Sequence, residues 1–217
     1  MDVAVRGDLA SCLTLRLAPA TWLFAVARGF GIVDGMPIAR AALGRLESEC
    51  RHRTHGTARA QRLQHSHVAA GTLCGSLSRV NGALYLRTPG HDDFVPAACS
   101  LSAALVVRNR AYVAHAGSTA VYLLHEGHAV SLTHGDTFDD APSPVLVRAL
   151  GVAPALTFAV TSIVLECGDV LTLCGRAANG EEEVLRVRYE AADDMLPPRE
   201  PRLWSRMLLR VRAMFRC

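Results

Sequence analysis

Several features that are common in proteins are absent or scarce in this 217-residue sequence. Lysine is absent: all 23 basic residues are arginines, which we attribute to a GC-rich genome. Aromatic residues make up 6 % of the chain, so alanine, valine and leucine must supply most of the core. No apolar run reaches the roughly 18 residues that a membrane-spanning helix needs. The start, Met1-Asp2-Val3, has no charged-then-apolar signal pattern, so nothing predicts export.

Paired cysteines are also lacking. The seven cysteines are scattered, and no Cys-x-x-Cys pair occurs among them. An odd, unpaired set favours a reducing compartment over a disulfide framework, and it argues against a structural zinc site. We therefore expect a cytoplasmic protein.

Charge of one sign is weak overall but concentrated at the C-terminus. The formal net charge is +3, too small to indicate nucleic-acid binding, so we expect no nucleic-acid partner. Residues 199–217 hold six arginines against one glutamate, a net charge of +5, and the preceding residues are mildly acidic. We therefore divide the chain into a body, residues 1–196, and a basic segment, residues 197–217.

The segment 201–216 is predicted to be an amphipathic helix. Apolar residues, Trp204 among them, recur on one face, while arginines such as Arg206 and Arg210 follow a four-residue spacing on another. Docking of the apolar stripe on the body is favoured over binding to a membrane surface or to a partner, since packing is the usual fate of such stripes. Trp204, Arg206 and Arg210 are the candidate partner-binding residues of this segment.

The remaining elements form separate blocks of strands and helices. Strands are predicted over 12–17, 22–27, 99–107, 111–116, 119–125, 128–133, 156–165 and 170–174. Helices are predicted over 37–51, over 58–87 with a break near Gly71 or Gly75, and over 143–150. Blocks of this kind, without regular alternation, predict an α+β fold.

Three stretches, in this order, resemble the metal-dependent type 2C (PPM-type) Ser/Thr protein phosphatases. Residues 24–31, FAVARGFG, look like the family's F-A-V-A-D-G-M-G. Residues 109–123, NRAYVAHAGSTAVYL, look like N-R-x-Y-V-A-x-x-G-D-S-R-x-Y-L. Residues 168–176, GDVLTLCGR, look like G-D-x-L-L-L-C-S-D-G. The resemblance covers roughly residues 3–180 and implies a four-layer αββα sandwich of two antiparallel sheets. Its outer helical layer would be reduced or replaced by residues 201–216.

The resemblance fails where the family places its metal-binding aspartates. Members hold two divalent cations through aspartates, and hard cations of this kind need several carboxylate oxygens. In this sequence the matching positions are Arg28, followed by the retained Gly29, then Ser118 and Arg176. A guanidinium keeps its positive charge, so it would repel a cation there. We therefore expect no catalytic residues and no metal or other cofactor.

An alternative register would restore one aspartate. Residues 30–36, FGIVDGM, also match the D-G-M pattern and would make Asp34 a metal ligand. We prefer the register with Arg28, because in the other one the strand 22–27 lies too early. A rebuilt site could also draw on Asp8, Asp136 or Asp139-Asp140, with Mn²⁺ or Mg²⁺ as its cofactor.

The resemblance therefore predicts a pseudophosphatase that acts by binding a protein, with a Ser/Thr kinase or a phosphoprotein as candidate partners. Arg6, Arg28 and Arg176 are the candidate phosphate-binding residues, since guanidinium groups form charge-assisted hydrogen bonds with phosphate. The alternative to phosphate binding is a structural role, in which these arginines pair with nearby carboxylates and fill the cleft. The alternative function is an active metal-dependent phosphatase. A Cys99–His115 nucleophile pair is a third candidate.

Overall fold

The computed structural model describes residues 10–30, 32–33, 36–87, 97–138, 145–146, 148–176 and 182–190. Two antiparallel sheets form the body of the molecule. The first sheet has the strand order β1 (Ala10–Ala18), β2 (Thr21–Phe30), β5 (Ala98–Val107), β6 (Arg110–Ala116) and β11 (Val160–Val164). The second has the order β13 (Glu182–Arg188), β12 (Val170–Arg176), β7 (Ala120–His125) and β8 (His128–Ser131). Two short pairs, β3 (Ile32–Val33) with β4 (Met36–Pro37) and β9 (Thr137–Phe138) with β10 (Val145–Leu146), complete the strands.

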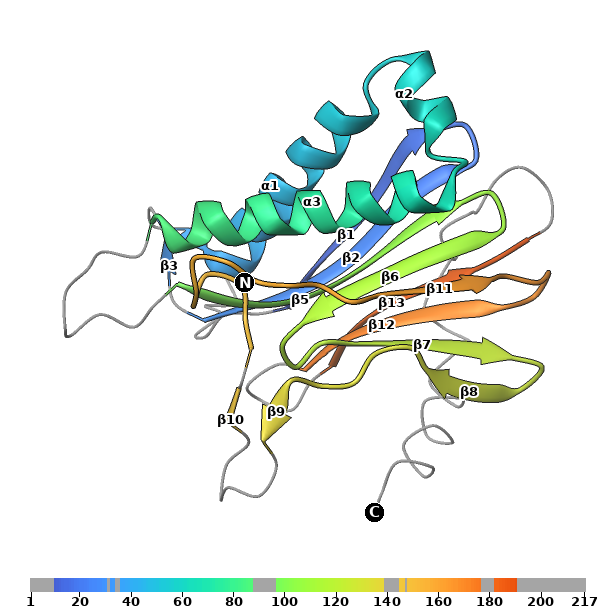
Figure 1. The fold of residues 1–217 in the computed structure, drawn as a ribbon. Helices are drawn as coiled ribbons and strands as arrows, with labels where there is room; N and C mark the ends of the chain where they lie inside the picture. The colour runs from blue at the N-terminus through green and yellow to red at the C-terminus, as the bar shows by residue number, and fades with distance from the viewer. Residues whose placement is uncertain are drawn as a thin grey trace, which may run out of the picture.

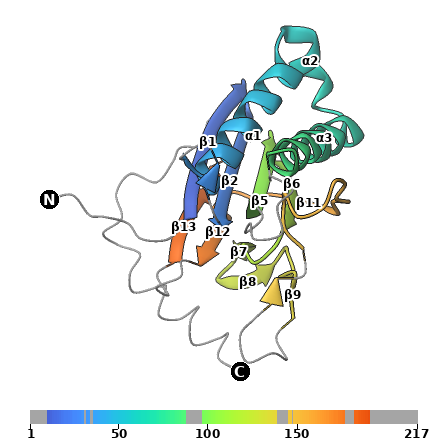
Figure 2. The same cartoon turned by 90° about the vertical axis from the view of Figure 1, so that its left-hand side faces the viewer.

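Three helices connect β4 to β5: α1 (Ile38–Thr54), α2 (Thr57–Arg62) and α3 (Ser66–Tyr85). Figures 1 and 2 show α1 and α3 across one face of the first sheet, with the second sheet on the side away from the helices. Among the described residues, helices cover the first sheet alone. The predicted α+β fold with two packed sheets is confirmed, and a reduced outer layer fits this arrangement. Residues 201–216, the expected replacement, lie outside the described part of the chain, as does the boundary at residue 196.

Each face of the first sheet packs against its own hydrophobic core. Towards the helices, Leu101, Ala103 and Leu105 of β5 pack with side chains of α1 and α3. Towards the second sheet, Ala104 and Val106 pack with side chains of β7 and β12. Successive residues of a strand point to opposite faces, so the buried Ser100 and Ser102 also lie on the face towards the second sheet. This alternation decides which polar groups of β5 can meet the second sheet.

Several predicted elements differ from the structure. The helix predicted over 58–87 breaks at residues 63–65, between α2 and α3, and both Gly71 and Gly75 lie inside α3. A Cβ on Gly75 would lie 2.8 Å from the Arg53 guanidinium of α1, so a larger residue there would displace that side chain. Leu63 lies in the break between α2 and α3, and burial of its side chain in the core fixes the position of that turn.

The helix predicted over 143–150 is wrong. Val145–Leu146 form β10, and the backbone of Leu150 exchanges two hydrogen bonds with Cys99, of 3.0 and 2.9 Å. The prolines at 142 and 144 supply no backbone N–H, which disfavours a helix there. The strand predicted over 156–165 is shorter, since β11 starts at Val160.

The strand β13 was not predicted. The last strand expected from the sequence ends at residue 174, yet Glu182 and Glu183 belong to β13, which pairs with β12 along its whole length. Leu185 and Val187 of β13 pack into the core between the sheets. Their two-residue spacing is the period of a half-buried strand.

Candidate functional site

The positions that replace the aspartates come together at one end of the sandwich. Arg28, near the end of β2, is opposite Ser100 of β5 in the strand register. Ser100 Oγ accepts a hydrogen bond of 3.0 Å from the Ser118 amide, and the two hydroxyls lie 3.3 Å apart. Ala120 of β7 is opposite Cys174 of β12, so the backbone of Arg176, two residues further along β12, reaches this same end. The sequence therefore selected positions that are neighbours in the fold.

Neutral hydroxyl groups occupy the space between the sheets at this end. Ser102 Oγ and Thr119 Oγ1 share a hydrogen bond of 2.8 Å, and both side chains are buried. With Ser100 and Ser118 they form what we call the hydroxyl cluster: Ser100, Ser102, Ser118 and Thr119. A buried hydroxyl is stable when its hydrogen bond is made, and these groups satisfy one another. The cluster brings no negative charge to the site.

The turn at Gly117 fixes the position of Ser118. Gly117 has a φ of 97°, a conformation that favours glycine, and a Cβ at this position would lie 2.2 Å from Ser100 Oγ. Any side chain here would therefore displace the hydroxyl on which the Ser118 amide depends. Glycine is required by the geometry of the turn, whatever residue follows it.

Asp136 places its carboxylate against this turn. Its Oδ2 accepts a hydrogen bond of 3.0 Å from the Gly117 amide, and its own amide donates one of 3.0 Å to the Gly117 carbonyl. Its Oδ1 accepts one of 3.4 Å from Arg148 Nη1, and His115 Nε2 lies 3.8 Å from Oδ2. Both carboxylate oxygens are thus engaged by groups of this chain. Asp136 clamps the turn, a role that sequence reasoning, which named it as a possible ligand, missed.

The partners of Asp136 are themselves anchored. Arg148 Nη2 donates a hydrogen bond of 2.7 Å to the Thr157 carbonyl, and the His115 ring bonds to the His134 carbonyl. We call His115, Asp136 and Arg148 the clamp. Arg148 carried no signal in the sequence, because the loop that brings it to Asp136 has no regular spacing.

Arg28 and Gly29 stand at the end of β2 beside the start of α1. The Arg28 guanidinium lies 5.2 Å from the centre of the Phe30 ring, a distance at which a cation is attracted to an aromatic face. A Cβ on Gly29 would lie 2.5 Å from the Ala39 amide nitrogen of α1. Gly29 therefore serves the close approach of strand and helix, which explains its presence without any metal.

Other predicted site residues cannot be placed. Arg6, Asp34, Trp204, Arg206 and Arg210 lie outside the described part of the chain. The backbone of Arg176 pairs with Glu182 across β12 and β13. The proposed convergence of Arg28 and Arg176 on a phosphate, and the alternative in which they fill the cleft, therefore stay predictions.

A cysteine nucleophile is not supported. Cys99 is buried in the core beneath the helices, and its thiol lies 3.3 Å from the Ser100 carbonyl, whereas His115 belongs to the clamp. The two side chains therefore do not meet as a pair. Burial raises the pKa of the Cys50 thiol, between α1 and α3, to about 11, so that thiol stays protonated.

Asp169 has a structural role at the turn before β12. It accepts hydrogen bonds of 2.7 Å from His125 Nδ1 and 2.8 Å from the Glu166 amide, and its own side chain is buried. The hydrogen bond to Asp169 raises the pKa of His125 above its ordinary value. The Gly-Asp motif of the sequence thus closes a turn.

The donor groups at the site do not fit a pair of divalent ions. Mn²⁺ and Mg²⁺ prefer carboxylate oxygens, and the positions Arg28, Gly29, Ser118 and Arg176 offer none. Among the residues with described positions, no three side chains of His, Cys, Asp or Glu gather closely enough to hold a metal ion. No catalytic step through such ions follows from this set of groups.

Comparison with solved structures identifies the fold. The chain is similar to the Streptococcus agalactiae serine/threonine phosphatase (TM-score 0.64, 16 % identity, covering 80 % of this chain and 76 % of that one). It is also similar to the serine/threonine phosphatase Stp1 of Staphylococcus aureus (TM-score 0.66, 14 % identity, 80 % and 72 %). The chain has the type 2C phosphatase fold. At these identities the likeness establishes the type 2C fold and nothing finer. No protein-family model matches the sequence, and no curated protein does.

One comparison corrects the expectation of no cofactor. The catalytic domain of the phosphatase PstP, solved in complex with two manganese ions, also has this fold (TM-score 0.55, 20 % identity, 77 % of this chain and 76 % of that one). The PstP structure shows that a protein of this fold holds two manganese ions, so the expectation of no cofactor, which rested on the replaced aspartates, is withdrawn. Manganese belongs in every assay of this protein.

Of the helices that the structure describes, none is long and apolar enough to cross a bilayer.

Proposed function

We propose that this chain is a pseudophosphatase: a type 2C phosphatase-like domain that acts by binding a protein and does not turn over phosphoesters by the two-metal mechanism. One observation carries the proposal. The end of the sandwich where the family's aspartates would gather holds arginine and neutral hydroxyl groups, and the nearby Asp136 is engaged by Gly117 and Arg148. Two-metal hydrolysis needs several carboxylates at once.

The proposed partner is a protein of a Ser/Thr phosphorylation pathway, either a kinase or a phosphoprotein, in the bacterial cytoplasm. The partner class comes from the type 2C likeness, and the compartment comes from the scattered cysteines. Two surfaces are candidates for the contact: the end of the sandwich, through Arg6, Arg28 and Arg176, and the arginine-rich residues 199–217 of the basic segment.

The test of inactivity is hydrolysis of para-nitrophenyl phosphate and of a phosphothreonine peptide, each with Mn²⁺ and with Mg²⁺. We expect rates at the level of the blank. A rate above the blank that disappears on Asp34→Ala would contradict the proposal and establish the alternative, an active phosphatase with a rebuilt metal site. The manganese-bound structure of PstP is the observation that favours this alternative.

A second experiment separates the two surfaces. Binding of a phosphothreonine peptide and of its unphosphorylated form is measured by calorimetry. If the sandwich end binds phosphate, Arg28→Ala/Arg176→Ala weakens binding of the phosphorylated form tenfold or more, and deletion of residues 199–217 leaves it unchanged. If the segment is the working surface, the deletion abolishes capture and the double variant does not. Failure of the phosphorylated peptide to bind any better than its control would exclude phosphate recognition.

A further inference from the structure

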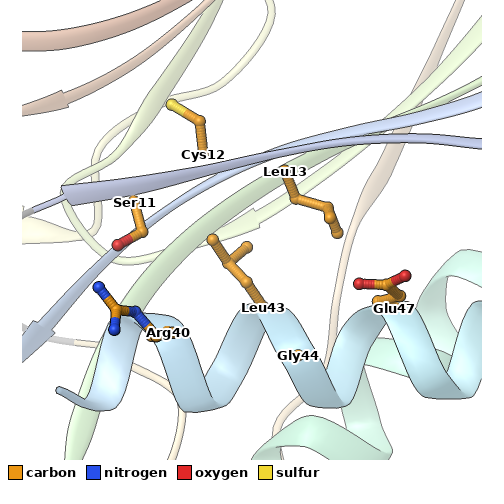
Figure 3. A pocket seen from close by; sticks show the side chains of 7 residues that line it. All are labelled: Ser11, Cys12, Leu13, Arg40, Leu43, Gly44 and Glu47. Carbon is orange, nitrogen blue, oxygen red and sulfur yellow. The ribbon is translucent and has the colours of Figure 1, made fainter. Parts of the chain in front are cut away.

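A pocket of about 430 Å³ lies between β1 and α1, at the outer margin of the first sheet. Figure 3 shows Ser11 and Leu13 of β1 facing α1, while Arg40, Leu43 and Glu47 of the helix line the other wall. Cys12 points to the opposite face of the strand. The pocket has an apolar middle, formed by Leu13 and Leu43, and charged groups of opposite sign at its two ends.

The strand beside the pocket is an edge strand. β1 pairs with β2 on one side, and no described strand pairs with its other side. An unpaired edge presents backbone N–H and C=O groups that can bind another strand, and native edges are usually protected by charges, prolines or bulges. Over Ala10–Leu15 the edge carries no charged residue and no proline, and its irregularity comes later, between Arg16 and Ala18. In the described part of the chain, no strand, charge or proline therefore protects the first half of β1 from strand addition.

The charges on α1 are self-complementary. Arg40 and Glu47 are seven residues apart, about 10 Å along a helix at 1.5 Å per residue, and both line the pocket. Gly44 lies between them, and a Cβ there would meet no atom within 4 Å. A helix face with a cation at one end, an anion at the other and a glycine between them complements an antiparallel copy of itself.

We propose that this margin is a twofold interface with a second copy of the chain. The axis is perpendicular to the sheet and passes near Cys12 and Gly44. Strand β1 pairs antiparallel with β1 of the second copy, so the two sheets join into one. Arg40 of each copy meets Glu47 of the other, giving two reciprocal ion pairs. An isologous interface requires this kind of self-complementarity, and twofold dimers are the commonest oligomers.

The spacing of strands and helices agrees with such an interface. Helix α1 contacts both β1 and β2, and both views show it running alongside β1. Adjacent strands lie about 4.8 Å apart. The twofold axis lies half a strand spacing outside β1, and a helix centred between β1 and β2 lies half a spacing inside it. In the plane of the sheet, the axis and the helix are therefore about 5 Å apart. The two copies of α1 would then lie about 10 Å apart, at the upper end of the 8–10 Å at which helices pack.

Two further features agree with this contact. Strand β13, at the edge of the second sheet, contacts β1, so both sheets end on this side of the molecule. Glu47 Oε1 is 2.9 Å from Arg51 Nε in the same helix, which orients the carboxylate and leaves Oε2 for a second partner. In the described part of the chain Arg40 makes no hydrogen bond or ion pair, so forming the interface breaks no such contact of its guanidinium there.

The register of the joined strands is also specified. A twofold axis perpendicular to the sheet maps each face of the sheet onto itself. Directly opposed residues of an antiparallel pair have their side chains on the same face. The axis must therefore pass through a residue of β1 and not between two residues. With the axis at Cys12, Ser11 of one copy is opposite Leu13 of the other. The two Cys12 residues are directly opposed, with Cα atoms about 4.5–5.5 Å apart, within disulfide reach.

Sedimentation of the full chain over 1–200 µM tests the proposal by charge reversal. We expect a dimer for the wild type, and a dissociation constant raised about tenfold or more for Arg40→Glu and for Glu47→Arg. Mixing these two variants restores opposite charges at both contacts, so we expect a heterodimer of near wild-type affinity. Arg108→Glu, the same reversal on the β5–β6 turn, leaves the dimer intact. A monomeric wild type, or a mixture no better than either variant, would overturn the proposal.

Crosslinking tests the register. In a Cys167→Ser/Cys217→Ser background, the oxidant diamide should give a disulfide-linked dimer, which disappears when Cys12→Ser is added. No crosslinked dimer in that background would contradict a twofold axis at Cys12. Binding of an unrelated peptide to β1 of a monomeric wild type would assign the edge to another partner and overturn the proposal equally.

Discussion

Gly29 shows how one residue of the type 2C pattern persists when the chemistry beside it has changed. The family's motif places a glycine after its aspartate, and here the glycine remains beside Arg28. The structure gives a reason unrelated to metal: the α1 backbone at Ala39 lies within 2.5 Å of any Cβ at this position. A motif residue can thus be held by packing alone.

We predict that Gly29→Ala lowers the free energy of unfolding by about 1–3 kcal/mol, the usual cost of overpacking. Urea denaturation measures it. The matched control is Gly71→Ala, in α3, where a Cβ would meet nothing within 4 Å. That change should raise stability by roughly 0.5–1 kcal/mol, because alanine is the better helix former. Equal effects of the two substitutions would refute the close approach.

The His125–Asp169 pair predicts a pH dependence of stability. Its hydrogen bond raises the folded-state pKa of His125 above the ordinary value of 6.5. The stabilisation is therefore fully present below pH 6.5 and disappears as the pH rises through the folded-state pKa. Against His125→Gln, the wild type should gain most stability near pH 5.5 and least near pH 8.5, as followed by thermal unfolding. A difference that does not change with pH would contradict this.

At the scale of elements, the sequence predicted well wherever a period was long and uninterrupted. The strands that became β2, β5, β6 and β12 and the helix that became α1 were found because apolar spacing alone defines them. Failures came where tertiary contacts decide: β10 depends on pairing with β9, and β13 depends on the free edge of β12. The strand β13 was not predicted because the charged residues at its start hid the alternating apolar pattern that follows them.

The same reasoning explains what was missed at the site. Arg28, Gly29 and Ser118 were found as neighbours because a resemblance in three ordered blocks carries spatial information. The clamp was missed, because His115, Asp136 and Arg148 come from separate segments joined by hydrogen bonds. Only folded geometry shows that Asp136 is engaged by the Gly117 turn.

Strand β13 is predicted to be essential for the second sheet. It covers one edge of β12 and adds Val187 and Leu185 to the core between the sheets. A chain ending at residue 190 should unfold cooperatively in urea, and one ending at residue 176 should not. Trp22, which packs on that same core, is the remaining tryptophan in both chains and reports by fluorescence. Identical transitions would show that β13 is dispensable.

For the whole molecule, the proposed loss of chemistry can be tested by reversing it. We predict that Arg28→Asp/Ser118→Asp/Arg176→Asp binds Mn²⁺ tenfold or more tightly than the wild type, because it replaces two cations and a hydroxyl by carboxylates. Calorimetry measures the affinity. The control, with asparagine at the same three positions, removes the charges without supplying carboxylates. Aspartate and asparagine variants that bind alike would show that these positions do not face the ion.

Strands β2 and β5 have neighbours on both edges and a hydrophobic core against each face, while the half-buried Arg28 and Ser118 lie at the rim just past those cores. Rim residues contribute little to burial, so selection can rewrite them at small thermodynamic cost. The architecture is thereby insulated from its reactive groups. In such a design an ancestral activity can fade or be exchanged for another while the same scaffold is inherited unchanged.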